Sequence, residues 1–491
     1  MNELLPINEA KLLAFFLPQY HPIPENNEWW GTGFTEWVNV MKGKPLFEGH
    51  YQPHFPADLG FYDLRVSEVR EEQAALAMKA GLGGFIYYHY WFNGRRLLER
   101  PVNEILASGK PDFPFALCWA NEPWSRNWDG RNRHVLMPQA YSQEDDLNHI
   151  RYLLNVFKDP RYIKIEGCPL FLVYRPSQLP DARATFAKWR AEAVAAGFPG
   201  LHLCAVAAFP DEFRASEDFG LDALAGFKPN LVDCGPRLTS SDPLDIGYRL
   251  HSVWPYEQLV KASLQSPHPE TTYYESVTPS WDNSVRRKSG GVIFKDATPE
   301  RYGAWLEEVI FRTQMSSTSA ARLIFINAWN EWAEGNHLEP CAKWGMAYIN
   351  ETRAALERAT ARFRSCQRLA GQVVDVVADC AGCVDLNKLG EDGLLSLEGW
   401  AAIVDVGRHP DALYIAEVSD DKYVLRFVVR DCFRHRGDVP AALGNETLSN
   451  TGWRFTHKSE PFEQGRQYVL LAFDAKRSLF FRATSFSVGS K

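Results

Sequence analysis

The chain has 491 residues, of which 45% are hydrophobic and 23% charged, and its formal net charge is −8. This composition excludes disorder, and the negative charge argues against a nucleic-acid partner. No apolar run reaches the roughly 20 residues that a membrane span needs. The N-terminus lacks the basic region of a signal peptide. Nine scattered cysteines favour reduced thiols and a cytoplasmic location.

Short apolar runs alternate with longer amphipathic ones in the first three quarters of the chain, which is typical of βα units around a parallel sheet. Strands covered on both faces read as continuous apolar runs. We expect eight of them, at 12–17, 84–90, 115–120, 169–174, 201–208, 223–227, 276–281 and 322–328. Expected helices cover 64–80, 96–109, 143–157, 181–196, 247–264, 299–315 and 350–366. The pattern predicts a (β/α)₈ TIM barrel, an α/β fold, with an open doubly wound sheet as the alternative.

After about residue 368 the pattern changes to short strands separated by Gly, Asp and Asn, without a long helix. The expected strands are 373–377, 395–406, 413–417, 423–429, 453–457, 468–473 and 480–488. We therefore predict a catalytic barrel over residues 1–367, followed by a smaller all-β sandwich, an accessory domain, over residues 368–491.

Tryptophans gather where the predicted barrel strands end, which is where the active site of such a barrel lies. The chain has 16 tryptophans. Those in or next to strand ends are Trp29, Trp30, Trp37, Trp91, Trp119, Trp124, Trp128, Trp281, Trp329, Trp332 and Trp344. Indole rings with amides, carboxylates and histidines between them suit a sugar, which has flat C–H faces and a rim of hydroxyls. The alternative is that these rings fill the core.

Glu331 and Glu334 follow the eighth expected strand and lie three residues apart. Cleavage of a glycosidic bond needs one group to protonate the leaving oxygen and a second to attack, stabilise or deprotonate. Burial among tryptophans would raise the pKa of one carboxyl, which would then stay protonated near neutral pH. We therefore predict that Glu331 and Glu334 are the catalytic pair. Two ordinary acids on an exposed loop are the alternative.

Glu122 offers a rival acid, because Asn121-Glu122-Pro123 looks like the acid/base motif of many retaining barrel glycosidases. It follows the third expected strand rather than the fourth, and the seventh ends in Asp282 rather than a glutamate. We expect Glu122 to be a pocket residue first. The full set of expected substrate-binding residues is Gln19, Tyr20, His21, Trp37, Tyr88, His89, Trp91, Asn121, Glu122, Trp124, Trp281, Asp282, Asn283, Trp329 and Asn330.

Several histidines are possible metal ligands, namely His21, His50, His54 and His89. His50 and His54 are four residues apart, but Pro53 places them on a loop. The pair Cys380 and Cys383 lacks the second pair of a zinc site. We expect neither a metal nor a cofactor. The loop from Trp29 to Trp37 either caps the cleft or fills the barrel mouth.

At these residues the sequence resembles a known family. Segments 15–21, 33–37, 88–92, 119–124, 281–283 and 327–340 together resemble the WbsX-type polysaccharide-biosynthesis proteins, which are relatives of glycoside hydrolase family 99. The resemblance covers about residues 10–360. In the tail, 397–401 and Arg430 look like β-sandwich modules appended to bacterial surface-polysaccharide enzymes.

The resemblance implies a (β/α)₈ endo-acting α-mannosidase that retains anomeric configuration. The family motif Asn-Glu-Trp-x-Glu-Gly matches Asn330 to Gly335, with Ala333 where family 99 tends to carry His. By this resemblance Glu331 is the base on the substrate's own 2-hydroxyl, which attacks the anomeric carbon to give a 1,2-anhydro sugar. Glu334 is the acid on the leaving oxygen. Asn330 lies near the 2-hydroxyl, and Tyr20 and Glu122 line the reacting subsite.

The sequence thus predicts a retaining, endo-acting glycoside hydrolase that cleaves α-linked, mannose- or rhamnose-type bacterial surface polysaccharide. One alternative is a transglycosylase or glycosyltransferase in O-antigen or capsule biosynthesis, for whose diphosphate only Arg175, Arg286 and Arg287 are candidates. Another is a non-catalytic glycan-binding protein. In the tail, Trp400 and Trp453 are candidates for glycan binding, and a structural or dimer-forming role is the alternative.

Overall fold

The computed structural model describes residues 10–125, 135–214, 218–267, 269, 271–316, 322–369, 371–389, 394–419, 422–429, 431–458, 462 and 466–488. Trp128 and Arg430 lie outside these ranges. The first nine residues, where we expected no leader, lie outside them as well.

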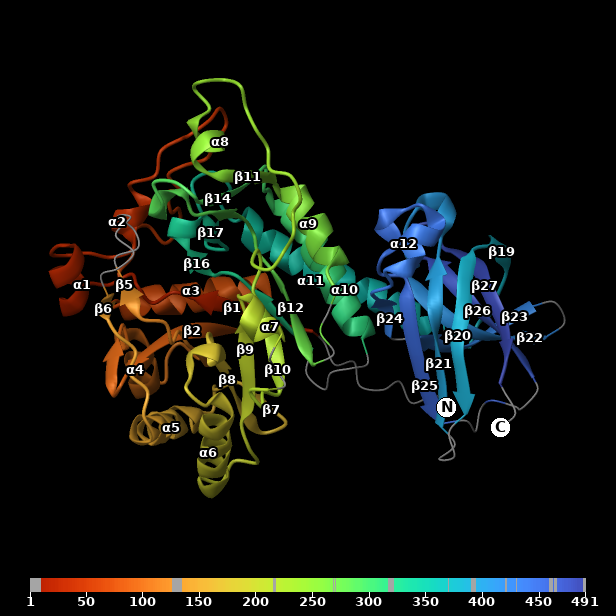
Figure 1. Ribbon diagram of the computed structural model, residues 1–491, viewed down its shortest axis with the longest axis horizontal. Helices are drawn as coiled ribbons and strands as arrows, with labels where there is room; N and C mark the ends of the chain where they lie inside the picture. Colours follow the sequence, from red (N-terminus) through yellow and green to blue (C-terminus); the bar gives the residue numbers. More distant parts are fainter. Residues whose placement is uncertain are drawn as a thin grey trace.

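Eight parallel strands form a closed barrel, which confirms the predicted fold (Figure 1). They are β1 (Lys11–Phe16), β2 (Leu82–Phe92), β4 (Phe115–Trp119), β8 (Cys168–Val173), β9 (His202–Ala207), β10 (Ala223–Gly226), β12 (Tyr273–Val277) and β15 (Leu323–Ile326). The ring closes because β1 pairs with both β15 and β2. Two antiparallel strands, β3 (Arg95–Leu97) and β7 (Lys164–Ile165), pair with β2 and β8.

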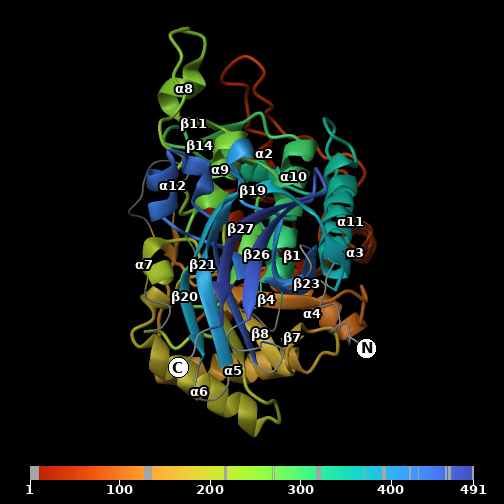
Figure 2. The same ribbon diagram turned by 90° about the vertical axis from the view of Figure 1, so that its right-hand side faces the viewer.

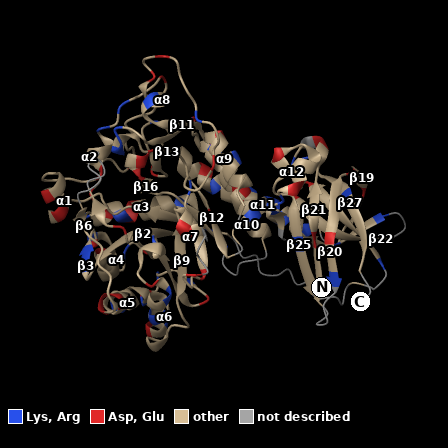
Figure 3. Ribbon diagram, in the orientation of Figure 1, with Lys and Arg blue, Asp and Glu red and all other residues tan. Residues whose placement is uncertain are grey.

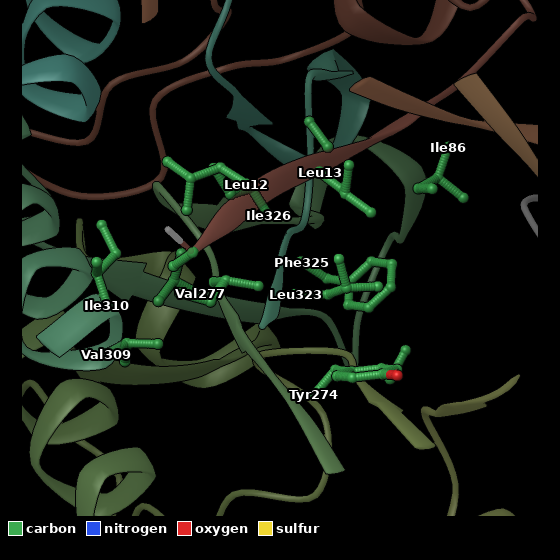
Figure 4. Packing of buried hydrophobic residues seen from close by; sticks show 14 of the residues in the cluster. Leu12, Leu13, Ile86, Tyr274, Val277, Val309, Ile310, Leu323, Phe325 and Ile326 are labelled. Carbon is green, nitrogen blue, oxygen red and sulfur yellow. The ribbon is translucent and has the colours of Figure 1, made fainter. Parts of the chain in front are cut away.

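The longer helices lie outside this ring, and several begin at a capping side chain. They are α3 (Ser67–Ala80), α4 (Arg100–Ser108), α5 (Gln143–Phe157), α6 (Ala182–Ala195), α10 (Pro299–Met315) and α11 (Ala347–Arg368). Ser142, Asp181 and Thr298 each accept a hydrogen bond from a backbone N–H in the first turn of α5, α6 and α10. Figure 4 shows the packing between the layers, where Val309 and Ile310 of α10 lie near Val277 and Ile326.

The helix expected over 247–264 is wrong. The segment forms α8 (Ile246–Leu250), β11 (Ser252–Pro255) and α9 (Tyr256–Gln265). Pro255 cannot sit inside a helix, because it lacks an N–H and its ring clashes with the preceding turn. Val253 and Trp254 pair instead with β14 (Val292–Lys295).

The seventh barrel strand also ends earlier than expected, at Val277. Trp281 and Asp282 belong to β13 (Trp281–Asp282), which pairs antiparallel to β14. The result is a small sheet in the order β11-β14-β13 on the loops that follow β10 and β12. Figure 1 shows β11 and β14 next to α8.

Shorter elements connect the strand ends to the helices. They are α1 (Pro24–Trp30), α2 (Trp37–Val40), β5 (Trp124–Ser125), β6 (Val135–Met137), η2 (Pro176–Gln178), α7 (Pro210–Arg214), η3 (Ser284–Arg286), β16 (Asn330–Glu331), η4 (Trp332–Glu334) and β17 (Asn336–His337).

The tail folds into two packed antiparallel-rich sheets, as predicted for a β-sandwich. One sheet has the order β18-β23-β22-β26-β27-β19 and the other β20-β21-β25-β24. The bounds are β18 (Val373–Val374), β19 (Val376–Asp379), β20 (Ala381–Leu389), β21 (Leu394–Ala402), β22 (Ala412–Ser419), β23 (Lys422–Val429), β24 (Asp431–Arg434), β25 (Gly452–Lys458), β26 (Gln467–Asp474) and β27 (Leu479–Ser487), with α12 (Asp438–Leu443) between β24 and β25. Strands β20 and β24 were not expected. Figure 2 shows this sandwich in front of the barrel.

The sandwich packs against α10 and α11 through charged and aromatic groups. Arg362 of α11 donates to Glu308 of α10 at 2.9 Å and to Asp411 at the start of β22. Arg312 of α10 lies 2.9 Å from a ring nitrogen of His409, and its guanidinium covers the ring of Phe433. The sandwich therefore contacts the barrel directly through these side chains.

Charges of both signs are spread over the barrel and the sandwich (Figure 3). Within the described residues, the helices are all too short or too polar to cross a bilayer. All nine cysteines have free thiols.

Candidate active site

A cavity of about 680 Å³ lies at the carboxyl ends of the barrel strands. Side chains from all eight strands or the loops after them line it, among them Gln19, Tyr88, Glu122, Tyr174, Phe209, Phe227, Trp281 and Glu331. This is the end of a TIM barrel that carries catalytic residues.

Glu331 and Glu334 both line this cavity. Glu331 ends β16 and is the N-cap of η4, a single 3₁₀ turn that ends at Glu334. A 3₁₀ helix has three residues per turn, so positions three apart lie on the same side. The spacing of the two acids therefore directs both toward one space. Gly335 ends the turn with a φ of 57°, in the left-handed region that favours glycine.

Arg286, the last residue of η3, binds both acids. Its Nη1 donates to Glu334 at 2.7 Å, and its Nη2 donates to Glu331 at 3.0 Å. Its Nε and Nη2 also donate to Glu36 Oε1 at 2.9 and 2.7 Å. The Glu36 side chain is 0% exposed. One guanidinium, on the segment after β12, thus joins three carboxylates that follow two other strands, β1 and β15.

Burial raises the pKa of Glu331 above its usual range, and Arg286 opposes that rise while Glu334 and Glu36 add to it. Burial likewise raises the pKa of Glu334, with Arg286 opposing and Glu36 adding. Two carboxyls that repel each other in a buried site release their protons in separate steps. The pair can therefore offer one protonated and one ionised carboxyl near neutral pH, which is what acid and base catalysis at one bond requires.

Glu122 lies on the same cavity but in a different ion pair. Arg175 donates to Glu122 at 2.9 Å and to the fully buried Glu212 at 3.0 Å. Burial raises the pKa of Glu122, and Arg175 opposes the rise. The guanidinium of Arg175 also stacks over Phe209, 3.8 Å from the ring centroid. Glu122 is therefore placed to contact a ligand beside the Glu331 and Glu334 pair rather than as part of it.

The structure brings about half of the expected site residues to the cavity. Those that line it are Gln19, Tyr88, Glu122, Trp124, Trp281, Asn283, Glu331 and Glu334. Trp30 lines it as well, whereas Trp37 packs behind the wall. The loop from Trp29 to Trp37 was expected either to cap the cleft or to fill the barrel mouth. The position of Trp30 is consistent with a cap, and that of Trp37 is consistent with filling the mouth.

Asn330, Tyr20 and Trp37 support the wall instead of lining it, contrary to our expectation. The Asn330 side chain accepts from Leu17 N at 2.7 Å and donates to Leu17 O at 3.0 Å. Tyr20 donates its hydroxyl hydrogen to Asn330 O at 2.6 Å. Trp37 Nε1 donates to Tyr62 O at 2.9 Å. These bonds tie the segment that carries Glu331 to the end of β1.

His89 and Trp91 point away from the cavity, toward α5. His89 Nε2 lies 3.0 Å from His149 Nε2, and Trp91 Nε1 donates to Asp145 at 2.9 Å. Successive side chains of a strand face opposite sides. Because Tyr88 points into the cavity, His89 points to the helix layer.

The other expected ligands are held by the protein itself. Asn121 exchanges two hydrogen bonds with the backbone of Arg175, at 2.8 and 2.7 Å. Asp282 accepts from Gln52 at 2.7 Å and lies 2.6 Å from His50 Nε2. Trp329 packs 5.1 Å from the ring of Phe85.

The histidines offer no metal site among the described residues, where no cluster of three or more His, Cys, Asp or Glu side chains could hold an ion. His54 Nδ1 lies 2.9 Å from His337 Nε2. Burial lowers the pKa of His21 and of His54 to about 4, so both are neutral at physiological pH.

The sequence analysis did not identify Glu36, and it considered Arg286 only as a candidate for binding a diphosphate. Glu36 stands in one of the segments that carry the family resemblance, between Gly33 and Trp37, and this was the only available signal. Trp254 and Phe294, which also line the cavity, were missed because the sheet that carries them was not expected.

The chain is similar to known proteins over most of its length. A family model described as glycosyltransferase WbsX matches residues 12–352. The uncharacterized protein WxcX of Xanthomonas campestris pv. campestris strain B100 is 46% identical over 478 residues, which is 97% of this chain and 65% of that protein. The chain thus spans less than two thirds of the length of the curated relatives that it matches.

Two solved structures are similar at low identity. The GH99 endo-α-mannosidase from Bacteroides thetaiotaomicron, in complex with BIS-TRIS-propane, is 15% identical with a TM-score of 0.45, over 72% of this chain and 98% of that one. A glycoside hydrolase-like protein is 14% identical with a TM-score of 0.46, over 71% of this chain and 95% of that one.

Proposed function

The chain belongs to the WbsX glycosyltransferase family, and from that premise we propose that it is a carbohydrate-active enzyme that breaks glycosidic bonds. The observation that carries the proposal is the arrangement of Glu331 and Glu334, which share the guanidinium of Arg286 on the wall of a cavity of about 680 Å³. The raised pKa of Glu334 fits the role of the acid, and Arg286, which opposes the rise in the pKa of Glu331, favours the ionised form that a base needs.

The mechanism that we propose uses the two acids and the 2-hydroxyl of the substrate. Glu331 takes the proton of the 2-hydroxyl, whose oxygen attacks the anomeric carbon, while Glu334 gives its proton to the leaving oxygen. The product is a 1,2-anhydro sugar. A water then adds to the anomeric carbon, giving its proton to Glu334, and O2 recovers its proton from Glu331. Two displacements retain the configuration.

Arg286 has a consistent role in this scheme. Its charge stabilises whichever carboxyl is ionised at each step, so the ionised group need not be exposed to water. Because Glu331 and Glu334 alternate in charge, a cation that touches both can serve both half-reactions.

At two of the three candidate arginines, Arg286 and Arg175, the arrangement favours a glycosidic bond over a nucleotide-sugar diphosphate as the bond that is broken. A diphosphate needs free cationic donors. All three nitrogens of the Arg286 guanidinium already donate to carboxylates, and Arg175 is bound to Glu122 and Glu212. A diphosphate at Arg286 would have to displace buried acids.

Transfer to a second glycan is the other candidate, and the name of the family, glycosyltransferase WbsX, favours it. A sugar hydroxyl in place of water would open the same 1,2-anhydro intermediate.

As substrate we propose an α-linked, mannose- or rhamnose-type bacterial surface polysaccharide, cut within the chain. We also propose that residues 1–367 are the catalytic part and residues 368–491 an accessory part, and the free thiols support a cytoplasmic location.

The test is to incubate the protein with α-linked mannans, rhamnans and bacterial O-polysaccharides, and to follow product size and anomeric configuration by NMR. We expect shortened or rearranged chains with retained configuration. Glu334→Gln should lower kcat by about a thousandfold or more, and glycan binding should remain measurable. Glu122→Gln, on the same cavity, is the matched control and should lower kcat far less.

The outcomes separate the candidates. New reducing ends indicate hydrolysis, and longer chains without new reducing ends indicate transfer. Release of a nucleotide from a sugar donor would contradict the proposed bond. Affinity without any product would identify a binding protein. If Glu334→Gln turns over as fast as the unchanged protein, the catalytic assignment is wrong.

A further inference from the structure

Three aromatic residues form one row across the small sheet β11-β14-β13. Trp254 of β11 is paired with Phe294 of β14, and Phe294 is paired with Trp281 of β13. Residues directly opposite each other on neighbouring strands project from the same face of a sheet. All three side chains line the cavity that holds Glu331 and Glu334.

The two faces of this sheet contact different parts of the structure. Val253 and Ile293, which alternate with the aromatic row, are 0% and 2% exposed and pack with Phe47. Lys295 lies on that side too, with its Nζ 5.9 Å from the ring centroid of Phe47. The sheet is therefore held from behind by its own small core, and the aromatic row does not serve that core.

Trp254 is held at the edge of its indole and against one neighbouring ring. Its Nε1 donates to Gly235 O at 3.0 Å, which fixes the indole by its edge. The indole stacks on the ring of Phe294, with the centroids 5.9 Å apart at an interplanar angle of 27°. Trp254 is only half-buried, whereas Trp281 and Phe294 are each 7% exposed.

We propose that this aromatic row is a stacking subsite for a pyranose other than the one whose bond is broken. The inference rests on the proposed function and extends it. The C–H face of a sugar ring matches a flat aromatic surface, while its hydroxyl rim needs polar groups at the border. Asn283 follows β13, Arg287 follows η3, and both line the same cavity, so polar groups are available near the row.

The consequence is a dependence on chain length. The row lies on the segments that follow β10 and β12, whereas the acids follow β15. A substrate long enough to reach both gains binding energy that a short one lacks. The subsite thus selects glycans that extend beyond the sugars on either side of the broken bond.

The experiment compares Trp254→Ala with the unchanged protein on end-labelled disaccharides and octasaccharides prepared from an α-mannan and an α-rhamnan. We expect kcat/KM for the octasaccharide to fall about tenfold or more, mainly through KM, and that for the disaccharide to fall much less. Trp254→Phe should restore most of the octasaccharide activity, because it keeps an aromatic face. Trp344→Ala, a half-buried tryptophan that does not line the cavity, should change neither.

Binding is measured separately by calorimetry in the Glu334→Gln background, where turnover does not interfere. We expect the added Trp254→Ala change to weaken octasaccharide binding about tenfold. Equal losses for both lengths, or no loss for the octasaccharide, would overturn the subsite and leave the proposed function intact. A protein that neither binds nor cleaves any of these glycans would overturn both.

Discussion

Glu36 and Arg286 are 250 residues apart in sequence, and two hydrogen bonds of 2.9 and 2.7 Å join them. Glu36 is the N-cap of α2, after β1, and Arg286 ends η3, after β12. Because Arg286 also binds Glu331 and Glu334, Glu36 fixes the position of the cation on which both acids depend. Glu36 is thus a positioning residue for the pair.

Glu36→Gln should lower the pH at which activity declines on the alkaline side. The negative charge of Glu36 contributes to the raised pKa of both Glu331 and Glu334. Without that charge each pKa falls, and the catalytic acid loses its proton at lower pH. The measurement is kcat/KM against pH. Glu212→Gln is the matched control, since Glu212 is equally buried but binds Arg175. An alkaline limb that stays in place in Glu36→Gln would contradict the assigned role.

Glu331→Gln should stabilise the protein increasingly as pH rises from about 4 to 8. The folded pKa of Glu331 is raised by burial, so the folded state binds its proton more tightly than the unfolded state does. That contribution is fully present below the unfolded pKa and is lost as pH rises through the folded pKa. Glutamine resembles the protonated acid and avoids the loss. Urea unfolding at several pH values provides the test, and a difference from the unchanged protein that does not grow with pH would refute it.

Gly335→Ala should destabilise the protein by about 1–2 kcal/mol and reduce activity. The φ of Gly335 is 57°, and an added Cβ would lie 3.2 Å from Asp282 Cβ. Any shift displaces Glu334, the preceding residue. Gly345→Ala is the control, because its φ is 49° and an added Cβ meets no atom within 4 Å. Both variants carry the backbone strain, so only the loss of activity should be specific to Gly335. Thermal unfolding and kcat report the two effects.

Arg362→Met should destabilise the protein by about 3–5 kcal/mol at neutral pH, because it removes a cation from two buried carboxylates. Burial acts to raise the pKa of Glu308, but Arg312 and Arg362 hold it well below its usual range. A depressed pKa contributes stability above the unfolded pKa and loses it as pH falls through the folded pKa. The cost of Arg362→Met should therefore shrink below about pH 4. Arg353→Met, which breaks an exposed pair with Glu357, should cost about 0.5 kcal/mol or less.

The barrel could be predicted because its strands are continuous buried runs, such as Leu170 to Val173, each with 0% exposure. The position of Glu331 and Glu334 on one cavity could be predicted because the two residues are closely spaced after a strand end. The sheet β11-β14-β13 could not, since Val253 and Trp254 become a strand only by pairing with residues about forty positions later. Asn330 was expected to bind substrate. Only the structure shows that both polar atoms of the Asn330 side chain are hydrogen-bonded to the backbone of Leu17.

The location of the aromatic row has a consequence for how such enzymes could diversify. Arg286 lies in η3, between β13 and β14, so the sheet that carries the proposed stacking surface also carries the cation of the two acids. Replacing that sheet as a whole would remove Arg286 together with the old glycan preference. A new preference would therefore have to arise by single substitutions within the row, and selectivity and reactivity would be inherited together.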